Sequence, residues 1–61
     1  MEKQISNKVN ELAKKVMNGE MLNRFLNETL KSRIVILAGL ACMAGEEEVA
    51  NMCGGFLRMV K

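Results

Sequence analysis

The segment from Ile34 to Ala44, IVILAGLACMA, has no polar side chain and constrains the fold more than any other part of the chain. Its eleven residues are too few to cross a bilayer, which takes roughly 20 apolar residues. The segment is also too uniformly apolar for a helix with one face in water. The remaining fifty residues can cover such a helix only in part. We therefore expect the protein to assemble with copies of itself or with a partner.

The residue composition favours one all-α domain spanning residues 1–61. A chain of 61 residues forms a single domain at most. Such a small domain is marginally stable unless a disulfide, a bound metal or oligomerisation stabilises it. Phe25 and Phe56 are the only aromatic residues, so the core has to be built from Leu, Ile, Val, Met and Ala. Proline is absent, so no position is barred from a helix.

The first predicted helix covers residues 3–18. Its apolar residues recur with the 4-3-4 spacing of one packed helical face: Ile5, Val9, Leu12 and Val16. The pair Asn18-Gly19 is expected to end this helix, because glycine accepts a positive φ at the position that follows a helix.

The second predicted helix covers residues 20–44 without interruption and would be about 37 Å long. Its first half is amphipathic and its second half is the apolar segment. The triplet Asn27-Glu28-Thr29 falls inside this helix, where its match to a glycosylation signal is taken as chance. Gly39 either weakens the helix or lets another backbone approach closely, and we favour a close helix crossing there.

The third predicted helix covers residues 46–60, after a cap at Gly45. Glu46, Glu47 and Glu48 suit the positive end of a helix dipole. An apolar stripe with helical spacing follows: Val49, Met52, Cys53, Phe56, Leu57 and Val60. Gly54-Gly55 lies off this stripe and either permits close packing on a second face or frays the last turn. The short connections favour antiparallel neighbouring helices.

We predict that the three helices assemble as a homo-oligomeric helical bundle, most simply a C2 dimer. The residues predicted to form the self-association seam are Ile34, Val35, Leu37, Ala38, Gly39, Leu40 and Ala41. The alternative is an ordinary core helix that the other two helices cover completely. A membrane span is not expected, because Lys31 and Arg33 on one side and three glutamates on the other bound the apolar segment.

The residue types argue against catalysis, bound metal and cofactors. The chain has no His and no Asp, so its hydroxyl and thiol groups have no imidazole to act as a base. Cys42 and Cys53 are eleven positions apart, which does not match a zinc site. No signal peptide is evident, so we expect a cytoplasmic protein with two buried, reduced thiols, with a single disulfide as the alternative.

The function expected from these features is that of a small adaptor or inhibitor that binds a larger protein. The basic residues predicted to form the partner-facing rim are Lys14, Lys15, Arg24, Lys31 and Arg33. If they converge, an oligomer that sequesters a small anionic ligand such as a nucleotide is an alternative. A nucleic-acid-binding regulator is a second alternative, although the net charge of +2 and the lack of Trp, Tyr and His disfavour it.

Overall fold

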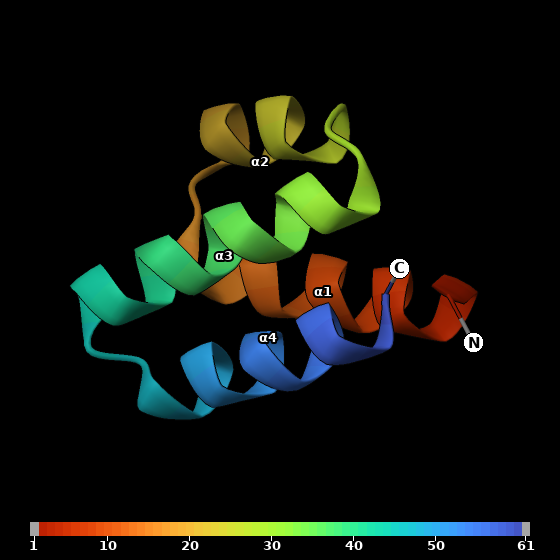
Figure 1. Cartoon of the computed structure of the whole chain (residues 1–61). Helices are drawn as coiled ribbons and strands as arrows, with labels where there is room; N and C mark the ends of the chain where they lie inside the picture. The colour runs from red at the N-terminus through yellow and green to blue at the C-terminus, as the bar shows by residue number, and fades with distance from the viewer. Residues whose placement is uncertain (1, 61) are drawn as a thin grey trace.

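Residues 2–60, the part of the chain that the computed structural model describes, form four α-helices and no strand. These are α1 (Glu2–Val16), α2 (Gly19–Leu26), α3 (Leu30–Ala44) and α4 (Glu47–Met59). In Figure 1, α3 runs across the middle of the molecule, with α2 on one side, α4 on the other and α1 behind it. The predicted all-α class is confirmed, whereas the predicted number of three helices is wrong. The predicted domain limits include Met1 and Lys61, which lie outside the described residues.

The first helix ends two residues earlier than predicted, because Asn18 belongs to the start of α2. The Asn18 side chain accepts a hydrogen bond from the backbone N–H of Met21 (2.9 Å), which is the usual contact of a helix N-cap. Gly19 is the first residue of α2, so it does not cap α1. Gly45 is the one described residue with a positive φ, at 76°.

The predicted continuous helix over residues 20–44 is wrong, since the chain breaks it at residues 27–29. The backbone N–H of Glu28 donates to the carbonyl of Phe25 (3.0 Å), which closes the end of α2. Thr29 is extended, and its hydroxyl accepts from the backbone N–H of Ser32 (3.2 Å) at the start of α3. Thr and Asn side chains offer the backbone such alternatives to a continuing helix. The break turns α2 back, so that Phe25 is buried in the core.

The connection between α3 and α4 agrees with the predicted cap at Gly45. The backbone N–H of Glu46 donates to the carbonyl of Ala41 (2.8 Å), and that of Gly45 donates to the carbonyl of Cys42 (3.3 Å). This pair of bonds satisfies carbonyls that the end of a helix leaves free. α4 then continues through Gly54 and Gly55 without a break, so the glycine pair does not fray it. Both glycines are exposed, and a Cβ at either would meet no atom within 4 Å.

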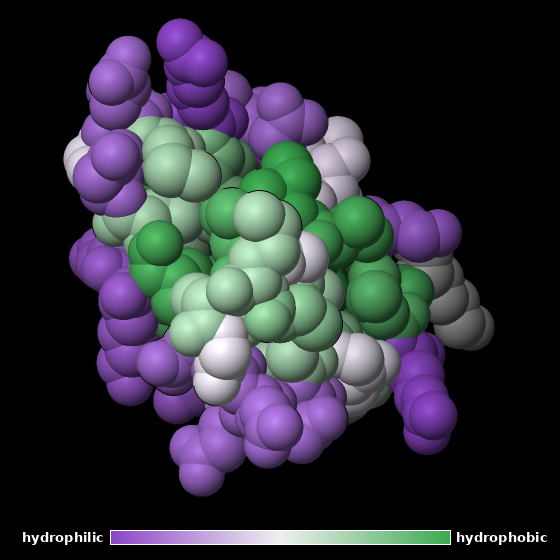
Figure 2. Space-filling model, turned by 90° about the vertical axis from the view of Figure 1, so that its left-hand side faces the viewer, coloured by the Kyte–Doolittle hydropathy of each residue, from purple (hydrophilic) through white to green (hydrophobic). Residues whose placement is uncertain are grey.

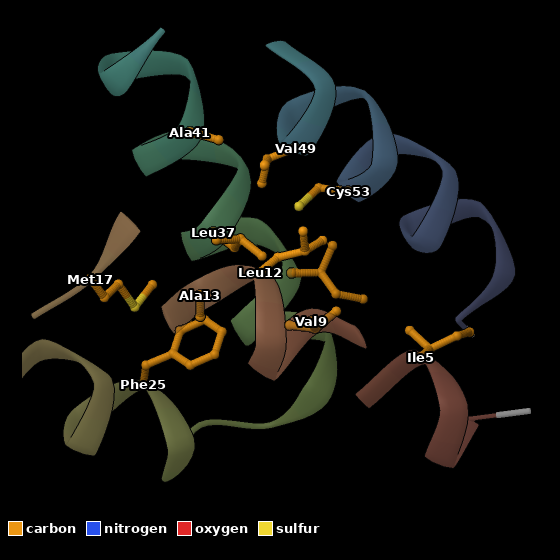
Figure 3. Packing of buried hydrophobic residues seen from close by; sticks show 11 residues of the cluster. Ile5, Val9, Leu12, Ala13, Met17, Phe25, Leu37, Ala41, Val49 and Cys53 are labelled. Atoms are coloured by element: carbon orange, nitrogen blue, oxygen red, sulfur yellow. The ribbon is translucent and has the colours of Figure 1, made fainter. Parts of the chain in front are cut away.

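One apolar core is shared by all four helices. α3 and α4 pack against each other more extensively than any other pair, and α1 packs against all three other helices. Figure 3 shows side chains from the four helices meeting in this core. Its buried members are Ile5, Val9, Leu12, Ala13, Met17, Phe25, Ile34, Leu37, Ala41, Val49 and Cys53.

Candidate protein-binding surface

From Ile34 to its end at Ala44, helix α3 is apolar around its whole circumference, but the chain covers only one side of it. Ile34, Leu37 and Ala41 follow helical spacing and are wholly buried against the other helices. Positions 35, 36, 39, 42 and 43 point away from that side, since each residue turns the helix by about 100°. Val35 is 54% exposed and Met43 is 85% exposed, although both are apolar. The fold thus leaves half of the apolar segment in contact with solvent.

The residues predicted to form the self-association seam lie on different sides of α3. The core of this chain already covers Ile34, Leu37 and Ala41, so a second chain cannot reach them, and Ala38 and Leu40 are half-buried. Val35 and Gly39 are the predicted seam residues that remain exposed. The exposed side also includes Ile36, Cys42 and Met43. Their place on the opposite side of the helix becomes evident only when the covered side is known.

An open hollow lies between α2 and α3, beside the exposed side of α3. Its volume is about 240 Å³. Its apolar lining is Met17, Met21, Phe25, Ile36 and Leu40, and its charged lining is Arg24 and Glu28. Because two of the lining residues are methionines, the hollow can adapt to side chains of different shapes.

A second open hollow lies at the start of α3 and adjoins the first. It is lined by Glu28, Thr29, Lys31, Ser32, Val35 and Ile36. Glu28 and Ile36 line both hollows, so the two meet at these residues. The side chain of Ile36 is 39% exposed and therefore stands at the junction, within reach of a binding partner.

We call the exposed apolar residues beside these hollows the outer face, which consists of Met21, Val35, Ile36, Gly39, Cys42 and Met43. Figure 2 looks onto the side of the molecule where α3 ends, and apolar side chains occupy the middle of that view, surrounded by hydrophilic ones. The exposed parts of the four large side chains in the outer face amount to on the order of 400 Å², the size of the largest apolar patch on a typical monomer, which is often a functional one.

Arg33 was predicted to belong to a partner-facing rim, but it lies half-buried between α1 and α3. Its Nη1 donates hydrogen bonds to Asn10 Oδ1 (2.8 Å) and Ser6 Oγ (3.2 Å), both in α1. Its Nε is buried and makes no hydrogen bond. Arg33 therefore connects the two helices within the chain.

The other predicted rim residues are exposed and are distributed over three helices. Lys14 and Lys15 end α1, Lys31 begins α3, and Arg24 in α2 pairs with Glu20 (4.0 Å). Arg24 lines one hollow and Lys31 lines the other, each together with Glu28. Neither of these two hollows contains more than one of the five predicted rim residues.

The two cysteines differ in exposure, so the expectation of two buried thiols is wrong for Cys42. Cys42 is exposed on the outer face, Cys53 is buried, and both are free. Burial raises the pKa of the Cys53 thiol from its ordinary value, and nearby Cys42 contributes to the rise. Among residues 2–60, no three potential metal ligands lie close enough to hold an ion. None of the described helices has the length and hydropathy that a membrane span needs.

Comparison of the chain with models of known protein families, with curated protein sequences and with solved structures finds no match. Its function is therefore inferred from its own residues.

Proposed function

We propose that this chain is a small non-catalytic interaction protein, an adaptor or inhibitor that binds and modulates a larger protein and that works as a homo-oligomer, most simply a dimer. The outer face carries this proposal. Val35, Ile36 and Met43 hold apolar surface in solvent beside two open hollows. Binding of another protein would remove this apolar surface from water, which is favourable in free energy.

The shape of the surface suits the side chains of another helix. A helix that lies along a groove inserts apolar residues spaced by one turn, and the hollow between α2 and α3 provides an apolar floor for such residues. Arg24 and Glu28 stand among its lining residues and supply charges of both signs. Such a rim favours a protein partner that itself carries both signs of charge.

We also propose that the protein acts in the cytoplasm. Cys42 is a free thiol on the surface, and Cys53 is a free thiol in the core. An exposed free thiol suits a reducing compartment, because disulfides form and persist in oxidising ones.

The test of the proposed function is capture of partners from a native extract by three tagged forms of the chain: the unchanged protein, Val35→Glu and Asn7→Glu. Val35→Glu adds a negative charge to the outer face. Asn7→Glu adds the same charge at an exposed position of α1, away from either hollow. We expect a protein that the unchanged chain and Asn7→Glu retain at least about tenfold better than Val35→Glu, a loss of about 1.4 kcal/mol in binding.

Circular dichroism of both variants checks that the helices are intact, which is expected because neither substituted side chain is buried. Equal recovery of every captured protein by all three forms would contradict a binding role of the outer face.

A further inference from the structure

We propose that the outer face binds a second copy of this chain, with the two α3 helices antiparallel and crossing at Gly39. In this dimer, Met43 of each protomer lies against Val35 and Ile36 of the other. The inference rests on the homo-oligomer of the proposed function and deepens it, because it names the interface and the orientation of the two chains. The hollow between α2 and α3, with Met17, Met21 and Leu40 in its lining, then remains for the larger protein.

Gly39 lies at the middle of the exposed side of α3, four residues after Val35 and four before Met43. A Cβ at Gly39 would meet no atom within 4 Å, so packing inside the chain gives no reason for a glycine there. Glycine weakens a helix interior, but it allows another backbone to come close. The close crossing expected from the sequence is absent within the described chain, and the open side of Gly39 is where a second chain can make it.

An antiparallel crossing at Gly39 places the exposed Met43 side chain of one protomer over the hollow that Val35 and Ile36 line in the other. Position 39+n of one helix then lies opposite position 39−n of the other, so Met43 faces Val35, and Cys42 faces Ile36. Met43 is the most exposed of the described large apolar residues, at 85%. Val35 and Ile36 line the hollow at the start of α3. The flexible methionine side chain can fill such an irregular recess.

Charges outside the apolar centre also favour the antiparallel orientation. Lys31 lies in the first turn of α3, and Glu46 and Glu47 follow its last turn, where the chain reverses into α4. Antiparallel helices therefore bring each lysine toward the acidic turn of the other chain, whereas parallel helices bring like charges together. Within residues 2–60, the one ion pair joins Glu20 and Arg24, so Lys31 and Glu47 are free to pair between chains.

The area of the outer face is sufficient for a small dimer. Its large side chains expose on the order of 400 Å² of apolar surface, and apolar area makes up about 60% of a typical interface. Complete burial of these side chains would thus cover at most roughly 650 Å² of each protomer and about 1,300 Å² of the pair, at the lower end of the range for specific protein interfaces.

Cysteine cross-linking distinguishes the orientations. Val35→Cys and Met43→Cys are made separately in a chain that carries Cys42→Ser, and each protein is treated with a short bis-maleimide, alone and as a mixture of the two. Cys53 can stay, because it is wholly buried. If the dimer is antiparallel, we expect the yield of cross-linked dimer in the mixture to be at least about tenfold higher than the yield from either variant alone. Positions 35 and 43 each lie about 12 Å along the helix from their own counterpart in the other chain.

The control is Cys42→Ser by itself, which should give no cross-link. Strong cross-linking of each variant alone would show a parallel dimer and overturn the orientation. A dimer in sedimentation that gives no cross-link in the mixture would place the interface elsewhere. A monomer at high micromolar concentration would overturn self-association. In that case, capture of a different protein that depends on Val35 would still support the proposed binding role of the outer face.

Discussion

At the scale of single residues, Arg33 is the side chain whose role differs most from its expected one. It donates to Asn10 and Ser6 from a half-buried position, and these are the side-chain hydrogen bonds that join α1 to α3. A charged donor held in this way contributes more than an exposed one, because water competes less for its partners. The residue thus stabilises the fold that presents the outer face.

Substitution of this arginine should destabilise the chain more than the same substitution on the surface. We expect Arg33→Gln to lower the free energy of unfolding by about 1–2 kcal/mol, because both bonds to α1 are lost. Arg24→Gln is the matched control, since 84% of the Arg24 side chain is exposed and its ion pair is long. Its effect should stay within about 0.5 kcal/mol. Urea unfolding measures the change in unfolding free energy of each variant. Equal changes in Arg33→Gln and Arg24→Gln would contradict the role of Arg33 in joining α1 to α3.

The buried thiol of Cys53 should make stability fall at alkaline pH. Desolvation by burial, followed by the effect of Cys42, holds the pKa of Cys53 in the folded chain above the ordinary value of a cysteine thiol. The neutral thiol therefore stabilises the fold fully below the unfolded pKa, and this contribution is lost as pH rises through the folded pKa. We expect the free energy of unfolding to fall more steeply above pH 9 in the unchanged protein than in Cys53→Ala.

A thiol reagent gives a second measurement of the same difference. At pH 8 it should modify Cys42 quickly and Cys53 slowly, since the first is exposed and the second is buried. Equal rates, measured with Cys42→Ser and Cys53→Ala, would contradict the burial of Cys53.

At the scale of helices, the break between α2 and α3 allows α2 to fold back and bury Phe25 in the core, which one long straight helix could not do. The apolar residues Leu22, Phe25, Leu26 and Leu30 keep helical spacing across residues 27–29, so periodicity alone predicts a continuous helix. The signal for the break is the capping residue Thr29, which sits just before α3. The unbroken helix would be about 37 Å long, whereas the longest dimension of the folded chain is 26 Å.

Removal of the cap at Thr29 should weaken the start of α3. We expect Thr29→Ala to lower the free energy of unfolding by about 1 kcal/mol, since the N–H of Ser32 loses its side-chain acceptor. Thr29→Ser keeps the hydroxyl and should stay close to the unchanged protein. Thermal unfolding followed by circular dichroism compares the midpoint temperatures of the two variants. An unchanged midpoint temperature in Thr29→Ala would show that the cap does not stabilise the start of α3.

At the scale of the whole molecule, the chain exposes more surface than its size requires. Its accessible surface is 4371 Å², whereas a folded monomer of its mass is expected to expose about 3,950 Å². The described helices enclose one core, but they are too few to cover α3 on both sides. Assembly would reduce this excess of accessible surface, because the proposed dimer covers the exposed side of α3.

Two glycine substitutions separate the stability of the chain from its assembly. Gly39 and Gly54 both lie in helix interiors, and a Cβ at either would meet open space. Alanine at each position should therefore raise the stability of the monomer by about 0.5–1 kcal/mol. We expect Gly39→Ala alone to weaken dimerisation in sedimentation equilibrium, because the added methyl separates the crossing helices. Equal dimerisation of both variants would contradict a crossing at Gly39.

The sequence by itself determined the helical class, the end of α3 at Gly45 and the apolar character of residues 34–44. These follow from composition, spacing and contacts over a few residues, which do not depend on the rest of the fold. The tertiary structure alone decided which side of α3 is covered, that Phe25 of α2 is buried in the core and that Arg33 faces α1. Burial depends on which distant elements lie against a residue, and an all-apolar helix has no polar side to indicate that choice in advance.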